Sequence, residues 1–341
     1  MRFILLVTKP YSFSILEPLY HYLADTDTDD VYYFLSKNIA TAPHDRKVMR
    51  SNAEVTEYQP DAILVPGNVV PHFWPGMKVQ LFHGLGEEKR GHYRITNFFD
   101  VYCTPGPYMT QKFQQLARRH NHFLVRETGW AKLDRIDEGK TVVQAKADLG
   151  FDPERPLILF APTFSPRYSS AQPLWPAIKN ILDKPFQWVF KFHDLMDRDF
   201  VRKVENTHHP NLILWHEPDI LPLMAAADIM ISDTSSVVYE YLLLDRPIIT
   251  YQARVRKDKG LDIDTPDDLF GAIIRSLEDP DEFHHRRQFY REDLHPYTDH
   301  QSSRRVIETV KSIYRNNELQ GLRPKRPNWI QKRQVRQIFS R

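Results

Sequence analysis

The chain has 341 residues, of which 41% are hydrophobic and 26% are charged, and its formal net charge is +2. This composition is typical of a globular protein with a substantial core, and the length suggests about two domains. The nearly balanced charge argues against a dedicated nucleic-acid-binding protein, so no nucleic-acid partner is expected. The single cysteine, Cys103, excludes an intrachain disulfide and makes a cysteine-based zinc site implausible, which fits a reducing compartment.

Short apolar runs alternate with helical patterns through the first half of the chain. Predicted strands lie at 3–8, 31–35, 62–65, 79–82, 100–104 and 122–127, and a helical pattern covers 14–24. The first run stops at Lys9-Pro10, so it is too short for a signal-peptide core or a membrane span, and no other apolar run is long enough to span. Strands that alternate with helices indicate a parallel α/β sheet.

A second series of apolar runs follows a charged, helical stretch at 134–156, where we expect the linker. These runs lie at 157–161, 188–192, 212–215, 229–231 and 248–250. Two successive α/β series predict two Rossmann-like domains that face each other across a cleft. We place the first at 1–148, the second at 149–310, and a C-terminal helix with a basic tail at 311–341. Ligands of such sheets bind beyond the carboxyl ends of the strands, so the loops after these runs are the candidate sites.

The most informative segment is 228–251, with the sequence DIMISDTSSVVYEYLLLDRPIITY. Its pattern predicts a strand, a polar turn of Ser232–Ser236, a helix over 237–244 and a second strand. Hydroxyl groups and unpaired amides at a helix start favour an anion, so Thr234, Ser235 and Ser236 are candidates for binding phosphate. The alternative is an ordinary helix cap, for which Ser, Thr and Asp are the preferred residues. Glu240 lies one helical turn after Ser236, where it could reach a ribose or simply face solvent.

Three further loops after predicted strands carry polar candidates. His83-Gly84 follows 79–82, and the imidazole suits a general base near neutral pH, unless it only caps the next helix. Thr163 and Arg167 follow 157–161, where a guanidinium could grip a phosphate, although polar surface loops are commoner. Lys191 and His193 alternate with aromatic residues, which suits either a pyrophosphate site or the polar face of an edge strand.

No metal site or cofactor is predicted. The histidines have no local ligand spacing, and neither a Walker P-loop nor a G-x-G-x-x-G motif occurs. Asp25, Asp27, Asp29 and Asp30 have D-x-D spacing, but they lie in a polar turn that we expect at the surface, so we do not interpret them as the DxD motif of a metal-dependent glycosyltransferase. Kinase and dinucleotide-oxidoreductase functions therefore lack their usual phosphate-binding loops.

The last residues are basic and contain no acid between Arg323 and Arg341. Apolar residues are interleaved with the basic ones: Trp329, Ile330, Val335, Ile338 and Phe339 alternate with Lys332, Arg333 and Arg336. Such a segment suits an amphipathic helix on an anionic membrane surface, and the alternatives are a terminal helix packed on the protein or a disordered tail.

Taken together, these segments resemble one family. The order FHG, TGWAKLD (128–134), FAPTF, KFH and ADIMISDTSSVVYEYLLLDRPIITY is similar to the motifs of the CDP-glycerol glycerophosphotransferases, which build the poly(glycerol phosphate) chains of teichoic acids and related capsular polymers. The similarity covers roughly 81–306, and the longest block is its most specific part.

The resemblance implies a GT-B fold, with the acceptor on the first domain and the nucleotide donor on the second, and transfer without a divalent metal in the catalytic step. His83 matches the family's proposed base, and His193 matches the histidine of its K-x-H-P motif. Asp233, Ser235 and Ser236 match the D-Y-S-S turn that holds the donor phosphates, and Glu240 takes the place of the aspartate that follows it.

The partners implied are CDP-glycerol as donor and a glycan, lipid-linked or polymer acceptor. The expected location is the cytoplasm, either free or attached to the inner face of the plasma membrane. The chain departs from the family pattern at Leu85, Ala131-Lys132, Ser165, Asp194 and Thr234. Two alternatives therefore stay open: a GT-B glycosyltransferase or epimerase that uses another nucleotide sugar, and a non-catalytic nucleotide- or polymer-binding protein.

Overall fold

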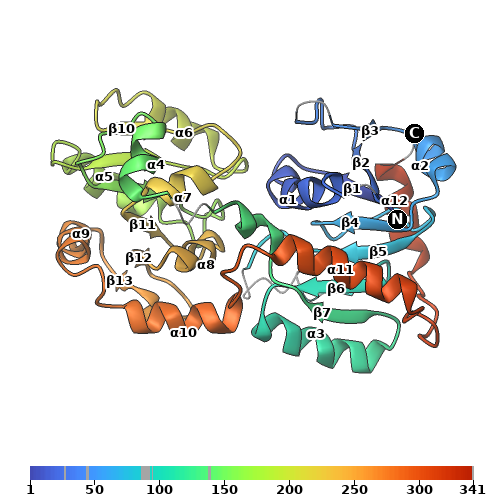
Figure 1. Ribbon diagram of the computed structural model, residues 1–341. Coiled ribbons are helices and arrows are strands. Elements are labelled where there is room, and N and C mark those ends of the chain that lie inside the picture. Colours follow the sequence, from blue (N-terminus) through green and yellow to red (C-terminus); the bar gives the residue numbers. More distant parts are fainter. Residues whose placement is uncertain (27, 44–45, 86–92, 94, 137–139, 340–341) are drawn as a thin grey trace. The chain divides into compact units, whose positions relative to one another are not determined.

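The computed structural model describes the chain except residues 27, 44–45, 86–92, 94, 137–139 and 340–341 (Figure 1). The chain forms two compact units: unit 1 comprises residues 1–83, 89–135 and 293–341, and unit 2 comprises 84–88 and 136–292. These limits differ from the expected boundaries, because 136–148 belong with unit 2 and 293–310 belong with unit 1. The chain therefore leaves unit 1 after Arg135 and returns to it at Asp293.

Unit 1 is built on a sheet of parallel strands in the order β3-β2-β1-β4-β5-β6-β7. The strands are β1 Arg2–Val7, β2 Asp30–Leu35, β3 Val48–Met49, β4 Ala62–Val65, β5 Met77–Gln80, β6 Val101–Thr104 and β7 Leu124–Glu127. In β1 the residues from Phe3 to Val7 are fully buried, as in a strand covered by helices on both faces. The six predicted strands are confirmed within two residues at their ends; β3 was missed because two residues give no pattern.

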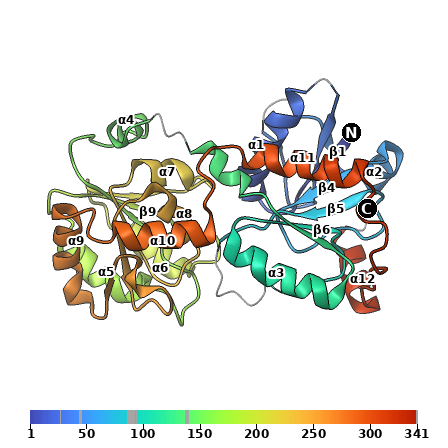
Figure 2. The ribbon, with the colours of Figure 1, turned by 60° about the horizontal axis from the view of Figure 1, so that its bottom comes forward.

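Helices cover both faces of this sheet. They are α1 Ser12–Ala24, α2 Asn52–Tyr58, α3 Pro107–His120, α11 Ser302–Arg315 and α12 Trp329–Ile338, with a 3₁₀ turn at Ala131–Arg135. Figure 2 shows α1 and α11 on one side of the strands and α3 and α12 on the other. The second side holds a hydrophobic cluster in which Phe113 of α3 and Val335 of α12 pack with Ile4 and Leu6 of β1. The alternation of side chains along β1 thus divides its apolar residues between two layers.

Unit 2 repeats the same topology with a second parallel sheet, in the order β10-β9-β8-β11-β12-β13. Its strands are β8 Leu157–Phe160, β9 Gln187–Phe190, β10 Leu212–Leu214, β11 Ile229–Ser232, β12 Ile248–Tyr251 and β13 Leu261–Ile263. All five predicted strands are present, and only β13 was not predicted. In both sheets the strand order reverses beside the first strand, between β1 and β4 and between β8 and β11. This is the Rossmann arrangement, and ligands bind at the carboxyl ends of the strands at that reversal.

The helices of unit 2 are α4 Val142–Asp148, α5 Ala171–Asn180, α6 Arg198–Glu205, α7 Leu221–Ala226, α8 Val237–Tyr241 and α9 Leu269–Glu278, and α10 His284–Leu294 leads back to unit 1. Capping residues in the sequence set the first residue of several of these helices. Thr141 and Gln144 form a capping box at α4, and the Asp197 carboxylate accepts from the Phe200 amide at 2.8 Å at the start of α6. One face of the sheet is filled by residues such as Trp175 of α5 and Ile273 of α9.

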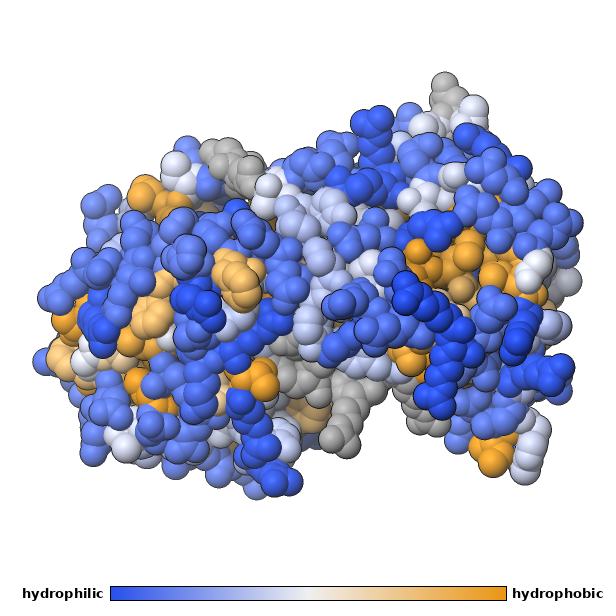
Figure 3. All heavy atoms as spheres, turned by 90° about the horizontal axis from the view of Figure 1, so that it is seen from below, coloured by the Kyte–Doolittle hydropathy of each residue, from blue (hydrophilic) through white to orange (hydrophobic). Residues whose placement is uncertain are grey.

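The face drawn in Figure 3 is mostly hydrophilic, and its hydrophobic residues form patches among polar ones, the largest of them on the right, on unit 1. Within the described part of the chain, every helix is too short or too polar to cross a lipid bilayer.

Candidate functional site

The site in unit 2 is organised by Asp233, which follows β11 at the point where the strand order reverses. Its carboxylate is 2% exposed and accepts hydrogen bonds from the Thr163 amide (3.0 Å) and from the Ser170 amide and hydroxyl (both 2.8 Å). Thr163 and Ser170 bound the loop after β8. The buried carboxylate therefore joins the loop after β8 to the turn after β11, which are the two segments where a ligand of this topology binds.

Asp233 differs from the other residues of the turn in its burial and in the pKa of its side chain. Burial raises the pKa of this carboxyl to about 6, although the hydrogen bonds from Ser170 and Thr163 lower it. Both carboxylate oxygens accept from protein donors. The family resemblance implies that Asp233 belongs to the turn that holds the donor phosphates, and in the structure its carboxylate is occupied by donors from the loop after β8.

Thr234, Ser235 and Ser236 follow Asp233 and are partly exposed. The predicted helix over 237–244 consists of α8, which has five residues, and a 3₁₀ turn at Leu242–Leu244. Among the described residues, the Ser236 hydroxyl makes no capping hydrogen bond to the first amides of α8. The alternative of an ordinary side-chain cap is therefore wrong for Ser236. Gly84 also belongs to unit 2 and lies beside this turn, since a Cβ on Gly84 would be 3.5 Å from the Ser236 hydroxyl.

Glu240 is only 5% exposed on α8. The expectation of a helix residue facing solvent is therefore wrong. A carboxylate in this position lies within the fold of unit 2, one helical turn after the partly exposed Ser236.

Lys191 and His193 lie beyond β9, which ends at Phe190, so they belong to a loop at the carboxyl edge and not to a strand face. Lys191 is partly buried, which lowers its pKa, while the nearby acids Asp194, Glu217 and Asp219 raise it. The His193 ring packs on Phe164 of the loop after β8, with 4.4 Å between the centroids. Its Nδ1 accepts from the Leu195 amide at 3.1 Å, so the neutral ring carries its proton on Nε2. His193 is thus set to donate a hydrogen bond from Nε2.

Arg167 is exposed and lies against the ring of Tyr168, with 5.7 Å from the guanidinium carbon to the ring centroid. The guanidinium of Arg254, which follows β12, lies 4.1 Å from the same centroid. Two guanidinium groups therefore meet on one aromatic ring at the carboxyl edge of the sheet. Arg254 was not predicted from the sequence, and the available signal was its position just after a predicted strand.

In unit 1, His83 follows β5 and is partly exposed. The ring of Tyr11, from the loop after β1, lies 5.7 Å from the His83 ring. The loops after β1 and β4 also meet, because a Cβ on Gly67 would be 3.6 Å from the Thr8 hydroxyl. His83 therefore lies at the carboxyl edge of the unit 1 sheet, beside loops from its strand-order reversal. That is the expected location for a residue that acts on a ligand of this sheet.

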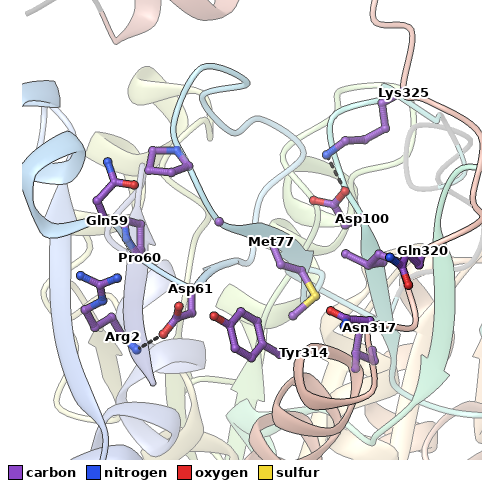
Figure 4. Close-up of a pocket in the computed structure, with 14 residues that line it drawn as sticks. Arg2, Gln59, Pro60, Asp61, Met77, Asp100, Tyr314, Asn317, Gln320 and Lys325 are labelled. Carbon is purple, nitrogen blue, oxygen red and sulfur yellow. Dashed lines mark hydrogen bonds and ion pairs between the residues drawn. The ribbon is translucent and has the colours of Figure 1, made fainter.

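A cavity of about 660 Å³ lies at the opposite, amino-terminal edge of the same sheet (Figure 4). Its walls include Met77 at the start of β5, Tyr314 of α11 and two polar pairs: the Arg2 amide with Asp61 at 2.8 Å, and Lys325 with Asp100 at 2.6 Å. None of the site residues predicted from the sequence lines this cavity. It is therefore separate from the candidate site.

Comparisons with known proteins agree with this arrangement. A model of the CDP-glycerol:poly(glycerophosphate) glycerophosphotransferase family matches residues 73–312, more than half of the chain. The teichoic acid poly(glycerol phosphate) polymerase of Bacillus spizizenii is 23% identical over 220 residues, which cover 60% of this chain and 55% of that protein. The chain thus matches little more than half the length of this relative.

Among solved structures, the wall teichoic acid polymerase TagF matches with a TM-score of 0.70 and 14% identity, covering 93% of this chain and 89% of that chain. The UDP-GlcNAc 2-epimerase of Neisseria meningitidis, bound to UDP-GlcNAc, matches with a TM-score of 0.64 and 14% identity, covering 92% and 100%. At such identities these structures bear on the fold alone, and they confirm the expected α/β architecture of the GT-B type. The family model, which matches residues 73–312, shows that the chain belongs to the CDP-glycerol:poly(glycerophosphate) glycerophosphotransferase family.

Proposed function

We propose that the protein transfers glycerol phosphate from CDP-glycerol to a hydroxyl of a cell-surface glycan or polymer acceptor and releases CMP. The observation that carries this proposal is the Asp233 anchor at the strand-order reversal of unit 2. It fixes the loop after β8 against a turn of partly exposed, hydroxyl-bearing residues in a chain of this family. Hydroxyls and amides arranged in this way suit a diphosphate.

Unit 2 supplies the donor site in this proposal. Thr234, Ser235 and Ser236 bind the phosphates, with Gly84 leaving room beside Ser236. Lys191 contributes a positive charge and His193 an Nε2 donor, which stabilise the charge that grows on the leaving phosphate. The guanidinium groups of Arg167 and Arg254 add positive charge at the carboxyl edge of the sheet. Glu240 supports the turn of Thr234, Ser235 and Ser236 from within the fold.

Unit 1 supplies the base. His83 takes the proton from the acceptor hydroxyl, whose oxygen attacks the β-phosphorus of CDP-glycerol in line. A bond forms between that oxygen and phosphorus, the bond to the bridging oxygen breaks, and CMP leaves with both electrons of that bond. Positioning and electrostatic stabilisation supply most of the rate in such a transfer.

The test is CMP release from CDP-glycerol, with and without membranes as a source of acceptor, beside a panel of UDP-, GDP- and CMP-sugars. Acceptor-dependent CMP release supports the proposal. Turnover of a nucleotide sugar in place of CDP-glycerol would overturn it in favour of sugar transfer or epimerisation. Thermal stabilisation by CMP without consumption of any donor would instead indicate a nucleotide-binding protein without catalysis.

His193→Ala should lower turnover by two orders of magnitude or more while the fold is retained, because the ring is exposed and its loss removes a donor to the leaving phosphate. The measurement is kcat with CDP-glycerol together with the melting temperature. His208→Ala is the matched control, since His208 is also an exposed histidine of unit 2. Equal kcat values in the two variants would remove His193 from the mechanism.

We also propose that α12 attaches the protein to the anionic inner face of the plasma membrane, near lipid-linked acceptors. One side of α12 packs on unit 1, through Val335 (3% exposed) and the adjoining Phe339 (5% exposed). The other side keeps Trp329 71% exposed and Ile330 50% exposed, next to the exposed Lys332 and Arg333. Apolar and basic side chains that share an exposed surface suit an anionic bilayer.

Replacing Lys332, Arg333 and Arg336 with glutamine should weaken binding to phosphatidylglycerol-containing liposomes roughly a hundredfold, at about 1 kcal/mol for each charge. Co-sedimentation measures this. Deleting the tail is a poorer test, because it would uncover the core around Val335. The control makes the same charge change at Arg118, Arg119 and Arg304, which are exposed on α3 and α11. Equal binding by both triple variants would contradict attachment through α12.

A further inference from the structure

The turn that carries His83 is held in an unfavourable backbone conformation. Phe82, directly before His83, has φ of 63°, in the left-handed region that a bulky residue rarely adopts. Such a conformation costs about 1 to 3 kcal/mol and persists only where the surroundings enforce it. The Phe82 ring is 1% exposed and packs on Phe113 of α3, with 5.0 Å between centroids. The core therefore holds the ring. Ring packing alone does not fix the peptide groups of the turn, so their conformation depends on contacts to the backbone.

Trp130 makes a contact with that backbone. The indole Nε1–H donates to the Phe82 carbonyl at 3.3 Å, and Trp130 is itself only 1% exposed. Trp130 lies between β7 and the 3₁₀ turn at Ala131–Arg135. A residue 48 positions further along the chain therefore binds the peptide group that orients His83.

His295 in turn binds Trp130. The Trp130 amide donates to His295 Nε2 at 2.9 Å, and His295 is 1% exposed. Burial lowers the pKa of His295 to about 4, so its ring is neutral at physiological pH and Nε2 remains an acceptor. A buried amide without this acceptor would be left unsatisfied, which is costly.

The segment that carries His295 is fixed against the same loop by further contacts. The Asp134 carboxylate accepts from the amides of Ser302 (3.0 Å) and Ser303 (2.6 Å) at the start of α11. The Arg305 guanidinium donates to the Thr128 carbonyl at 2.9 Å. Gly129 has φ of +80°, and a Cβ there would lie 2.4 Å from the Ser302 hydroxyl, so only glycine fits this approach. The place of His295 relative to Trp130 is therefore well defined.

We propose that His295 and Trp130 are positioning residues, which hold the Phe82–His83 turn in its strained conformation and so aim the His83 imidazole at the acceptor hydroxyl. This inference rests on the proposed role of His83 as base. Misplacement of a catalytic group by about 1 Å can lower a rate roughly a hundredfold. Loss of the contacts should therefore lower kcat while the affinity of unit 2 for the donor is unchanged.

The first test compares Trp130→Phe with Trp74→Phe. Trp74 is a matched control, because it is 2% exposed in the same unit and its indole donates to Asn52 Oδ1 at 2.7 Å. Both changes remove a hydrogen bond that a buried tryptophan donates, although the bond of Trp74 is itself only partly buried. Trp130→Phe should lower kcat by about ten- to a hundredfold with little change in KM for CDP-glycerol. Trp74→Phe should keep the wild-type kcat, and equal kcat values for the two variants would overturn the proposal.

The second test replaces His295. Gln at this position keeps an acceptor near the place of Nε2, whereas Leu removes it at similar size. His295→Gln should retain most of the turnover, and His295→Leu should behave like Trp130→Phe. Equal losses in both variants would show that His295 acts only through packing, and would overturn its role.

A readout that does not depend on activity separates this inference from the proposed function. The rate of His83 modification by diethyl pyrocarbonate, followed by peptide mass spectrometry, reports how the ring is presented. This rate should change severalfold in Trp130→Phe and His295→Leu but not in Trp74→Phe. If the rate changes as expected while His83→Ala stays active, the positioning is correct and the base assignment fails. An unchanged rate in Trp130→Phe and His295→Leu would overturn the positioning itself.

Discussion

His83→Ala should lower kcat for CMP release by about 10² to 10⁴, the usual contribution of a general base, while the protein stays folded. His83 is partly exposed beyond the end of β5, so truncation leaves no large cavity in the core. The imidazole is the group in this turn whose ordinary pKa suits proton transfer near neutral pH. The measurement is kcat and KM with saturating acceptor, beside the melting temperature.

The control is His122→Ala. His122 is 7% exposed and lies two residues before β7, which begins at Leu124, so it is near the amino end of that strand and away from the carboxyl edge that carries His83. The His122→Ala variant should lose more free energy of unfolding than His83→Ala but keep the wild-type kcat. His83→Gln should be as slow as His83→Ala, because an amide cannot accept the proton. Turnover close to wild type in either His83 variant would exclude His83 as the base.

Asp233→Ala should abolish measurable transfer and lower the free energy of unfolding by about 3 kcal/mol or more. The change leaves the amides of Thr163 and Ser170 and the Ser170 hydroxyl without their acceptor, and each buried unsatisfied donor costs about 1 to 3 kcal/mol. The loop after β8 then loses its tie to β11, so the donor site fails together with the stability. Urea unfolding monitored by tryptophan fluorescence measures the second effect.

The matched control for this change is Asp199→Ala. Asp199 is an exposed aspartate of α6 that pairs with Arg202 on the surface, and such pairs contribute about 0 to 1 kcal/mol. If Asp233→Ala unfolded at the same urea concentration as Asp199→Ala, the anchoring role of Asp233 would be wrong.

The pH dependence of stability gives an independent check on Asp233. Its pKa is about 6 in the folded protein, above the ordinary 3.8, so the unfolded chain releases this proton at a lower pH. The contribution of the carboxyl to stability is therefore largest below about pH 4 and declines as the pH rises through 6, by about 3 kcal/mol. Relative to Asp233→Ala, the wild type should lose stability between pH 4 and pH 7. A difference between the two proteins that stays constant over this range would contradict the raised pKa.

Most of the fold could be predicted from the sequence because its strands are nearly continuous apolar runs. Strands such as β8 and β11 are fully buried, and a fully buried parallel strand leaves a strong local pattern. β3, with two residues, and β13, in which only Ile263 is buried, leave no such pattern. The return of the chain to unit 1 at Asp293 has no local signal either, because it depends on packing between α1 and α11, which are distant in sequence.

The candidate site was predictable in its location but less so in its internal contacts. Strand ends followed by polar residues locate His83, Lys191 and Ser236 at the carboxyl edges. The inward direction of Asp233 depends on Ser170, 63 positions away, and the contact between His295 and Trp130 spans 165 positions. No pattern within a short window contains such pairs. The resemblance to a family located the turn after β11. Only the folded structure distinguishes Asp233, which anchors the turn, from Thr234, Ser235 and Ser236, which are partly exposed on it.

The return of the chain to unit 1 has a consequence for biosynthesis. Unit 2 is almost complete once residue 292 has been made, whereas unit 1 still lacks α11, α12 and His295. Until residues 293–341 leave the ribosome, the apolar layers over β1 and β4 stay open to solvent, and such surfaces recruit chaperones or aggregate. The strained turn that presents His83 also lacks its support until then. The half that we propose carries the catalytic base is therefore finished last, so a growing chain acquires its donor-binding fold before it can acquire activity.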